Sequence, residues 1–492
     1  MEQHQEAVKK VAERVKSFHE RQIPFRVYHG STNSTRHVGY DAEKVIDTSA
    51  LSHVISIDST ACTAIVEPNV PMDKLVAATL AQGFVPQVVP EFPGITVGGS
   101  FSGTAAESSS FKYGYFDRSV NWVEMVLATG RLVTASPHDN ADLFYGAVGA
   151  CGTLGVTTLF EIKLIPAAKY VQVTYVPVYS TKAALEEIDR CTRESWDYID
   201  GILYSATLGV IVLGRITDGQ EALQGGVPVR RFARARDPWY YMHCHCQAMN
   251  DDKPVTELVP MHDYFFRYDR GAFWMGSFGW PPKLFNRLTR FLADPLFRTR
   301  QMYKAMHLSR RAQQFIVQDL ALPREGADEF LTWSYDTLAL FPLWLCPVDA
   351  NTKAPLHRAK RMSSRQPQPT SRATEKNTEE QSQITVNVGL WGTNQSYPVQ
   401  TVADNRAIEA KVYQLGGLKW LYAHNYYTED EFWNVYDKQR YSQLRAKWDA
   451  GTLPTLWDKM KNTQTFEKDG NFAKAAFLTL FGREHLLKKT AK

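Results

Sequence analysis

Three short stretches rich in glycine, serine and threonine follow strand-like segments in the first third of the chain. They are 28–36 (YHGSTNSTR), 90–114 (PEFPGITVGGSFSGTAAESSSFKYG) and 142–156 (DLFYGAVGACGTLGV). Backbone N–H groups in successive tight turns form a concavity that binds anions, and only small residues let a pyrophosphate approach the backbone closely. We therefore predict that the three stretches together form a cradle for a phosphate-bearing cofactor.

Two other interpretations of such a stretch are a flexible linker and a structural turn. Strands precede and follow the second stretch closely, and Val97, Phe101 and Tyr113 are interspersed in it, which excludes a linker. The spacing of the doublet 98–99 and Gly103 is not G-x-G-x-x-G, and no P-loop lysine follows. Rossmann and Walker sites are therefore excluded, while any single stretch remains compatible with a structural turn.

The elements around these stretches predict an α+β fold. Alternating apolar segments indicate strands, and apolar residues at helical spacing indicate amphipathic helices, over a first domain of residues 1–166. A second α+β unit, the substrate or cap domain, follows over 167–427. A capping box formed by Thr428 and Glu431 opens the last well-formed helix, within a C-terminal helical segment over 428–492.

Composition limits the class of partner. The 492 residues include 56 Lys and Arg against 52 Asp and Glu, a near balance that gives no reason to expect nucleic acid. A hydrophobic fraction of 44% predicts a packed core. Within 351–382, Leu356 and Met362 are the only large apolar residues, so we predict a disordered insert that buries too little surface to fold.

The sequence indicates no metal site, disulfide framework, signal peptide or membrane span. The HCHC string at 243–246 is predicted on a helix and has no second Cys/His pair at zinc-finger spacing, so no metal is expected. Without an apolar h-region or a run of about 18 apolar residues, we expect neither a signal peptide nor a membrane span. The predicted location is cytoplasmic, with at most peripheral contact with the endoplasmic reticulum. The scattered cysteines predict no disulfide framework: Cys62, Cys151, Cys191, Cys244, Cys246 and Cys346.

The same residues resemble a known family. The three stretches are similar to the loops that surround the flavin in the FAD-binding domain (PCMH type) of the vanillyl-alcohol oxidase superfamily. The string ESSSFKYG at 107–114 narrows the resemblance to the Delta(24)-sterol reductase branch, the 24-dehydrocholesterol reductase or Diminuto-like group. Further strings resemble that branch across most of the sequence, namely DPWYYM, FFRYDRGAFW, VQDLALP, FPLWLCP and LYAHNYYTEDEFWNVYD. The insert and the last residues are not covered.

The resemblance implies FAD as cofactor, bound non-covalently. Many members carry a flavin-linking histidine near the position of Asn33, and His29 is implied as a turn residue rather than a covalent anchor. Carried over position by position, the implied flavin contacts are His29, Gly30, Ser31, Thr32, Asn33 and Ser34 in the first loop, Pro90, Glu91, Thr96, Val97, Gly98, Gly99, Gly103, Glu107, Ser108 and Ser109 in the second, and Gly149, Gly152, Gly155 and Val156 in the third.

The resemblance also implies a reaction, in which NADPH, through reduced flavin, reduces an isolated carbon–carbon double bond in the tail of a sterol or related isoprenoid. An unactivated alkene cannot accept hydride alone, so an acid in a dry pocket must deliver a proton. A tyrosine polarised by arginine and a carboxylic acid with a raised pKa are the two kinds of donor that fit. The catalytic candidates are Tyr264, Arg267, Asp269, Arg270, His424 and Tyr426, for which structural ion pairs and ring packing are the alternative interpretation.

Two other functions remain open. One is an FAD-dependent oxidase or dehydrogenase of an alcohol or secondary metabolite, and the other is a catalytically idle flavin- or sterol-binding protein. Phe111 and His424 stand where the animal members have histidine and an acidic residue, and we expect no N-terminal membrane anchor of the kind that animal and plant members carry. No NADPH motif is visible, and a homodimer is compatible with the sequence.

Overall fold

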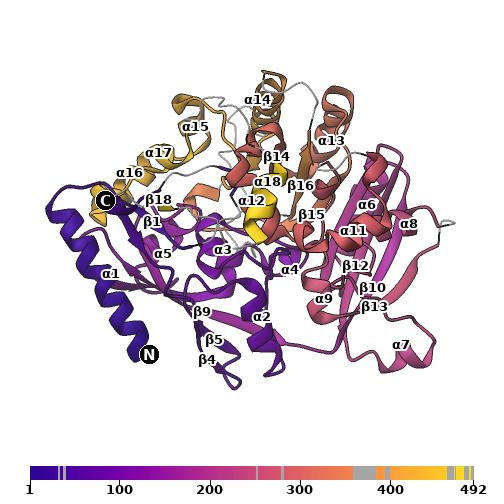
Figure 1. Ribbon diagram of the computed structural model, residues 1–492, viewed down its shortest axis with the longest axis horizontal. Coiled ribbons are helices and arrows are strands. Elements are labelled where there is room, and N and C mark those ends of the chain that lie inside the picture. The colour runs from indigo at the N-terminus through magenta and orange to yellow at the C-terminus, as the bar shows by residue number, and fades with distance from the viewer. Residues whose placement is uncertain are drawn as a thin grey trace, which may run out of the picture.

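The fold is described from a computed structural model. It describes residues 1–30, 34–36, 40–250, 253–278, 282–357, 384–393, 399–462, 470, 472–480 and 487–488. Two large sheets, one of six strands and one of eight, are covered by helices (Figure 1). The predicted α+β class is confirmed.

The six-stranded sheet forms the core of the N-terminal part. Its strands are β4 (Val54–Asp58), β5 (Thr63–Val66), β6 (Phe84–Pro86), β7 (Val120–Val126), β8 (Leu132–Ala135) and β9 (Val156–Pro166). The order is β4-β5-β9-β7-β8, and β6 also pairs with β9. β9 is the longest of these strands and alternates buried with half-buried residues, as a strand with one face on the core must.

Helix α1 (Glu2–Glu20) packs one apolar face on this sheet. Val8, Val11, Val15 and Phe18 recur at helical spacing and are all buried. His4 joins the helix to the sheet, because its two ring nitrogens bond to Glu67 at 2.9 Å and to Glu124 at 3.3 Å. Helix α2 (Met72–Leu80) covers β4 and β6.

The glycine-rich stretches connect short elements at one edge of this domain. β1 (Arg26–Tyr28) pairs in parallel with β3 (Val45–Asp47), and the first stretch lies between them. The second stretch forms α3 (Val97–Gly103) and α4 (Ser110–Tyr113), and the third includes most of α5 (Ala141–Ala147) and the turn after it. Thr96 caps α3 by accepting a hydrogen bond from Gly99 N, so the glycine doublet forms a helical turn rather than an open loop.

The eight-stranded antiparallel sheet has the order β13-β10-β12-β11-β15-β16-β14-β17. The strands are β10 (Tyr170–Val178), β11 (Tyr198–Ser205), β12 (Leu208–Thr217), β13 (Val255–Pro260), β14 (Ile316–Pro323), β15 (Leu343–Asp349), β16 (Ile384–Gly392) and β17 (Leu418–Lys419). Its central strands are buried on both faces. One face carries α6 (Thr181–Cys191), α13 (Arg324–Leu338) and α14 (Val399–Gln414). On the opposite face, Trp344, Cys346 and Trp391 join the core of the N-terminal domain.

Six further α-helices lie in the described part of the segment between β12 and β14, and α8 among them packs on β10 and β12. They are α7 (Gln220–Gln224), α8 (Tyr240–Ala248), α9 (Met261–Phe265), α10 (Met275–Phe278), α11 (Arg287–Leu292) and α12 (Thr299–Ser309). α12 packs against α18 (Phe472–Leu480), and the two lie side by side near the middle of the molecule (Figure 1). Two-residue strands β2 (Tyr40–Asp41) and β18 (Leu487–Lys488) pair in parallel.

The C-terminal helices correct one prediction. The capping box of Thr428 and Glu431 is confirmed, but the single helix predicted after it is two helices, α15 (Glu429–Val435) and α16 (Lys438–Lys447). Tyr436 is extended, with φ −102° and ψ 145°, and the carboxylate of Asp437 caps α16 by accepting from Arg440 N. α17 (Leu456–Met460) and α18 follow, so α16 is not the last helix.

The predicted domain limits at 166 and 427 stay predictions. The first of them falls between two strands, because β9 ends at Pro166 and β10 begins at Tyr170. Most of the predicted insert lies outside the described residues, which include its first part to His357. Among the described helices, none is long and apolar enough to cross a membrane. All six cysteines are free thiols.

Candidate active site

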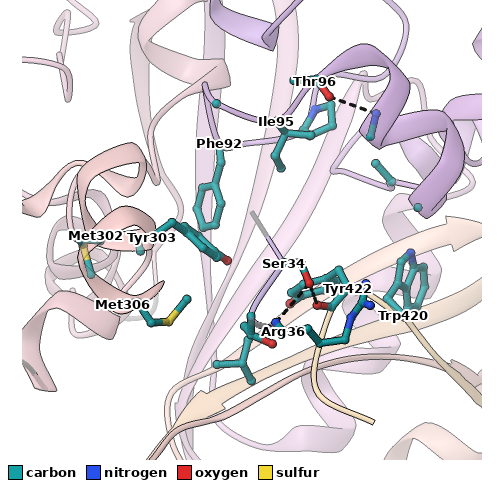
Figure 2. Close-up of a pocket in the computed structure, with 18 of the residues that line it drawn as sticks. Ser34, Arg36, Phe92, Ile95, Thr96, Met302, Tyr303, Met306, Trp420 and Tyr422 are labelled. Carbon is teal, nitrogen blue, oxygen red and sulfur yellow. Dashed lines mark hydrogen bonds between the residues drawn. The ribbon is translucent and has the colours of Figure 1, made fainter. Parts of the chain in front are cut away.

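A cavity of about 1240 Å³ lies between the N-terminal domain and the eight-stranded sheet. One wall consists of the glycine-rich stretches, and the other consists of strands β14, β15 and β16 with the loop after β17. Helix α12 contributes Met302, Tyr303 and Met306 at one side, facing Phe92 (Figure 2). The cavity therefore joins a small-residue wall, an apolar compartment and a sheet face.

The small-residue wall is built by α3 and the third stretch. Gly98, Gly99 and Gly103 line the cavity, and a Cβ on Gly98 would lie 2.9 Å from the Pro68 Cβ. A Cβ on Gly103 would meet nothing within 4 Å, so this position borders open space. Gly152 has φ +71°, a conformation that residues other than glycine rarely adopt. The backbone is thus accessible to a ligand along this wall.

One corner of the cavity collects positive charge. Arg26, Arg36 and Lys459 all line it. Arg36 donates to the Lys459 carbonyl at 2.8 Å, and Lys459 Nζ donates to the Cys151 carbonyl. The pKa of Lys459 is lowered to about 8. Burial is the main cause, the two arginines add to it, and Cys151 opposes it. Among the described residues, no carboxylate pairs with Lys459, so the corner is suited to an anionic ligand.

His29 lies beside this corner. Its Nδ1 is buried without a hydrogen-bond partner among the described residues. Burial, and then the charge of Lys459, lower the pKa of His29 to about 4, so the ring is neutral at pH 7. A neutral ring with an unpaired nitrogen at the cavity wall can hydrogen-bond to a ligand.

Acidic groups line both walls, Glu91 from the second glycine-rich stretch and Asp319 from β14. Glu91 and Asp319 both line the cavity, and Tyr422 lies beside Asp319. Burial raises the pKa of Asp319 to about 6. Burial, and then the charge of Glu107, raise the pKa of Glu91 well above its usual range. The acidic groups border aromatic and aliphatic side chains, so the cavity changes from a cationic corner to acids of raised pKa.

These features suit FAD. The three cations and the unpaired His29 nitrogen would hold a pyrophosphate, while the accessible backbone of α3 and Gly152 leaves room for the rest of a dinucleotide. A flavin ring would then have the sheet face opposite it. The donor set of the cavity therefore agrees with the cofactor that the sequence implies.

Comparison of the sequence with known proteins also indicates an FAD-binding domain. The family described as FAD binding domain matches residues 5–136. The Delta(24)-sterol reductase of Mus musculus is 28% identical over 420 residues, which cover 83% of this chain and 76% of the mouse protein. That of Pisum sativum is 27% identical over 471 residues, 88% of this chain and 79% of the pea protein. The sequence is therefore similar to Delta(24)-sterol reductases over most of its length.

A third relative matches a shorter part of the sequence. Cytokinin dehydrogenase 9 of Oryza sativa is 32% identical over 136 residues, which are 27% of this chain and 26% of the rice protein. The predicted resemblance to the Delta(24)-sterol reductase branch and to its FAD-binding fold is therefore confirmed.

The structure places most of the described residues implied for FAD at the cavity. Ser31, Thr32 and Asn33 lie outside the described residues. Those that line the cavity are His29, Ser34, Pro90, Glu91, Thr96, Gly98, Gly99, Gly103, Gly152, Gly155 and Val156. Those that do not are Gly30, Val97, Glu107, Ser108, Ser109 and Gly149. Whether each contacts FAD stays a prediction.

Glu107 and Ser108 instead contact residues after 166, whereas Ser109 bonds within the N-terminal part. The Ile199 N–H donates to the Ser108 carbonyl, and Ser109 Oγ donates to the Gln87 carbonyl at 2.8 Å. Glu107 Oε1 accepts from Ser108 Oγ at 3.0 Å and from Arg267 Nη2 at 3.3 Å. Burial raises the pKa of Glu107 to about 7, with Arg267 opposing the rise.

The predicted catalytic residues are not brought to the cavity. None of the six, all of them within the described part of the protein, lines it. Arg267 is buried, and its Nη2 donates to Asp200 at 2.8 Å while its guanidinium lies 4.2 Å from the Tyr264 ring centroid. Arg270 donates to Asp294 at 2.6 Å, and Asp269 accepts from Thr299. These contacts are those of the structural alternative, ion pairs and ring packing.

His424 and Tyr426 lie in a neighbouring polar cluster. The His424 carbonyl accepts from Lys419 Nζ at 2.6 Å, and the Tyr426 N–H donates to Glu409 at 2.9 Å. Burial lowers the pKa of His424 to about 3, so its ring is neutral. The catalytic assignment of these residues stays a prediction, with the geometry against direct contact with a cavity ligand.

Sequence reasoning missed the acids and rings of the sheet wall. Asp319 lies in the VQDLALP string, which entered the reasoning only through the resemblance, and Tyr422 lies in LYAHNYY. One signal was present, because Val317, Asp319 and Ala321 share one face of a predicted strand and Asp319 interrupts an apolar series. A lone carboxylate on an apolar strand face warrants a functional interpretation.

Proposed function

We propose that this protein is an FAD-dependent reductase that uses NADPH to saturate an isolated carbon–carbon double bond in the tail of a sterol or related isoprenoid. One observation carries the proposal. A single cavity joins a cradle suited to FAD with an apolar compartment that contains buried carboxylic acids. The homology with Delta(24)-sterol reductases over most of the sequence supports the same reaction class.

The size and lining of the cavity support a large apolar substrate. Its volume of about 1240 Å³ exceeds the roughly 300–1,000 Å³ of an ordinary ligand pocket. There is room for a dinucleotide and a second ligand. Phe92, Met302, Met306, Trp344 and Trp391 line the part away from the cationic corner, and their apolar surfaces suit a fused-ring hydrocarbon.

The residues of this protein have three tasks in the reaction. Bound FAD, when reduced, supplies hydride transfer. The aromatic and thioether side chains bind the apolar substrate and exclude water, which would otherwise quench a cationic centre. A buried acid holds the proton that must go to the less substituted alkene carbon, because hydride is accepted only where positive charge develops. NADPH would reach FAD through the same cavity, since the sequence contains no separate nucleotide motif that would direct it elsewhere.

Two alternatives make different predictions about the flavin. An alcohol oxidase or dehydrogenase would be reduced by its alcohol, and an oxidase would be reoxidised rapidly by air. An idle binding protein would show flavin that neither NADPH nor substrate changes. The acids of raised pKa in the cavity favour the reductase over both alternatives, because proton delivery to carbon requires a neutral acid.

The test is anaerobic stopped-flow of the FAD-loaded protein with NADPH, followed by flavin absorbance. We expect bleaching by NADPH, reoxidation on mixing with a Delta(24) sterol in detergent micelles, and slow reoxidation in air. Mass spectrometry should find the sterol product two hydrogens heavier. Flavin that NADPH leaves oxidised, while an alcohol bleaches it and air restores it rapidly, would refute the reductase.

A further inference from the structure

We propose that Tyr422 and Asp319 form the proton relay of this reaction, with Tyr422 as the catalytic residue that protonates the alkene. The inference rests on the proposed function and adds the identity of the acid. It differs from the six catalytic candidates of the sequence, none of which reaches the cavity.

The two side chains meet at the cavity wall. Tyr422 Oη donates to Asp319 Oδ2 at 2.6 Å, and both residues line the cavity. Asn387 Nδ2 donates to the other carboxyl oxygen of Asp319 at 3.1 Å. Trp391 Nε1 lies 3.4 Å from Tyr422 Oη. Each polar group of the pair is thus oriented by a neighbour that also lines the cavity.

The sheet explains why residues so far apart in sequence meet. Asp319 lies on the cavity face of β14, opposite Gly389 of β16. A Cβ on Gly389 would lie 2.6 Å from the Trp391 ring and 3.1 Å from Asp319 Oδ1, so glycine leaves the space that both side chains occupy. β17 pairs with β14, and the Trp420 N–H donates to the Asp319 carbonyl at 3.0 Å, which brings the backbone to Tyr422.

Tyr422 is also attached to the first cofactor stretch. Its carbonyl accepts from Ser34 Oγ at 2.6 Å and from the Thr35 N–H at 3.2 Å. Figure 2 shows Ser34 and Arg36 beside the Tyr422 side chain, with the hydrogen bonds drawn. The residue that presents the phenol to the cavity is therefore fixed to the loop that forms the cationic corner. This link holds the donor at a set distance from a bound cofactor.

The step balances in atoms and charge. The alkene π pair forms a C–H bond with the phenolic proton of Tyr422, and the O–H bond breaks. In the reactive state Asp319 is protonated and its O–H donates to Tyr422 Oη across the same 2.6 Å contact, which frees the phenolic proton for the alkene. The Asp319 proton moves to Tyr422 Oη as the phenolic proton leaves, so Tyr422 is neutral before and after. The negative charge ends on Asp319, where Asn387 donates to it. The tertiary carbon becomes cationic and accepts the hydride that reduced FAD supplies in the proposed function, and a solvent proton then restores Asp319.

The electrostatic setting supports this division of roles. Burial raises the pKa of Asp319 to about 6, against the lowering effects of Tyr422 and Asn387. Asp319 is therefore an acid that is reprotonated near neutral pH and is stronger than the phenol, whose pKa is raised by burial and by Asp319. Among the described residues, the titratable groups that interact with Asp319 are Tyr422, Tyr303 and Glu91.

The experiment separates the two half-reactions. FAD-loaded wild type, Tyr422→Phe and Asp319→Asn are first reduced anaerobically with NADPH, and the reduced proteins are then mixed with a Delta(24) sterol in micelles. We expect an unchanged rate of reduction in both variants and a loss of flavin reoxidation by about 100-fold or more. Tyr175→Phe is the matched control, because it removes the hydroxyl of a buried tyrosine that donates to Glu257 at 3.4 Å and does not line the cavity.

Two further readouts exclude a merely structural effect. In wild type, the reoxidation rate should fall by about tenfold per pH unit above about pH 6, as Asp319 loses its proton, and Asp319→Asn should lack this dependence. In deuterated solvent, the wild-type product should carry one deuterium on the less substituted carbon. FAD content and melting temperature show that each variant is folded, and if Asp319→Asn is not, Tyr422→Phe carries the test.

The outcomes are distinguishable. Wild type that the sterol fails to reoxidise refutes the proposed function and the relay with it. Wild type and both variants reoxidised at similar rates would overturn the relay alone. Loss of reoxidation in Glu91→Gln with Asp319→Asn unaffected would also overturn it and assign the proton to Glu91.

Discussion

Replacing Lys459 by methionine should change two properties in opposite directions. Lys459 lies in the cationic corner with Arg26 and Arg36 and has no carboxylate partner among the described residues. A buried cation without a counter-ion destabilises the fold, and an anionic ligand relieves that cost. We expect Lys459→Met to stabilise the cofactor-free protein and to weaken FAD binding.

The magnitude follows from the pKa. A fall from 10.5 to about 8 corresponds to about 3 kcal/mol of lost stability while the lysine is charged. Methionine removes this cost but also the hydrogen bond to the Cys151 carbonyl, which contributes about 1 kcal/mol. The net gain is about 2 kcal/mol, or a rise of several degrees in the melting temperature of the apoprotein. Loss of a charge-assisted contact to the pyrophosphate should cost about 1.5–3 kcal/mol, or roughly 10- to 100-fold in the Kd for FAD.

The pH dependence has a definite sign. The folded pKa of Lys459 lies below the unfolded one, so its destabilising effect is complete below about pH 8 and disappears as the pH rises toward 10.5. Apo wild type should gain stability over that interval, and apo Lys459→Met should not. FAD binding favours the charged lysine, so the wild-type Kd should rise above about pH 8.

The assay is differential scanning fluorimetry of the apoprotein together with FAD titration by flavin fluorescence. Lys461→Met is the matched control, because Lys461 lies on the same segment, pairs with Asp458 at 2.8 Å and does not line the cavity. It should leave the Kd unchanged. A Lys459→Met apoprotein that melts lower than wild type would refute the stability argument, and an unchanged Kd for FAD would refute the pyrophosphate assignment.

Two further substitutions test the cradle and the docking of the first helix. Gly103→Ala should leave the melting temperature of the apoprotein unchanged but lower FAD retention on gel filtration. The added Cβ would lie within 4 Å of no protein atom and would occupy cavity space that we assign to FAD. Full FAD retention would contradict the cradle. His4→Gln should destabilise the protein by about 2 kcal/mol at pH 6 in denaturant titrations. The hydrogen bonds to Glu124 and Glu67 raise the pKa of His4 to about 9, so its contribution is complete below pH 6.5 and lost as the pH rises through about 9. If wild type and His4→Gln differ in free energy of unfolding by the same amount at pH 6 and at pH 10, the assignment of this stability to protonated His4 is wrong.

Most of the described small residues that the sequence singled out line the cavity, because their signal is local, while their contacts with FAD stay predictions. Small residues at turns and glycine at positive φ each depend on a few neighbouring residues. The sheets, their α+β class and helices such as α1 and α2 follow from periodicity that a short window contains. The division of the last long helix at Tyr436 and Asp437 was missed because the apolar pattern continues through the break.

The sequence did not indicate which polar residues line the sheet wall of the cavity, because their pairings are long-range. Arg267 lies in a sequence segment rich in polar residues, which indicated a catalytic role. In the structure its guanidinium instead donates to the buried carboxylate of Asp200, 67 residues away in the sequence. Asp319 and Tyr422 are separated by 103 residues and meet only through the register of β14 with β17. A sequence pattern shows which residues can ionise, but the fold determines which of them face a ligand.

The distribution of charge along the cavity restricts what can bind there. At one corner, Lys459 has no carboxylate partner among the described residues, so a ligand end without negative charge would leave its charge without a counter-ion. Elsewhere in the cavity, burial raises the pKa values of Glu91 and Asp319, so an anionic ligand end would be repelled by either group when it ionises. Under the proposed function, a dinucleotide would bind with its pyrophosphate toward Lys459. The substrate beside Asp319 would have to be uncharged where it meets the proposed relay, as the hydrocarbon tail of a sterol is.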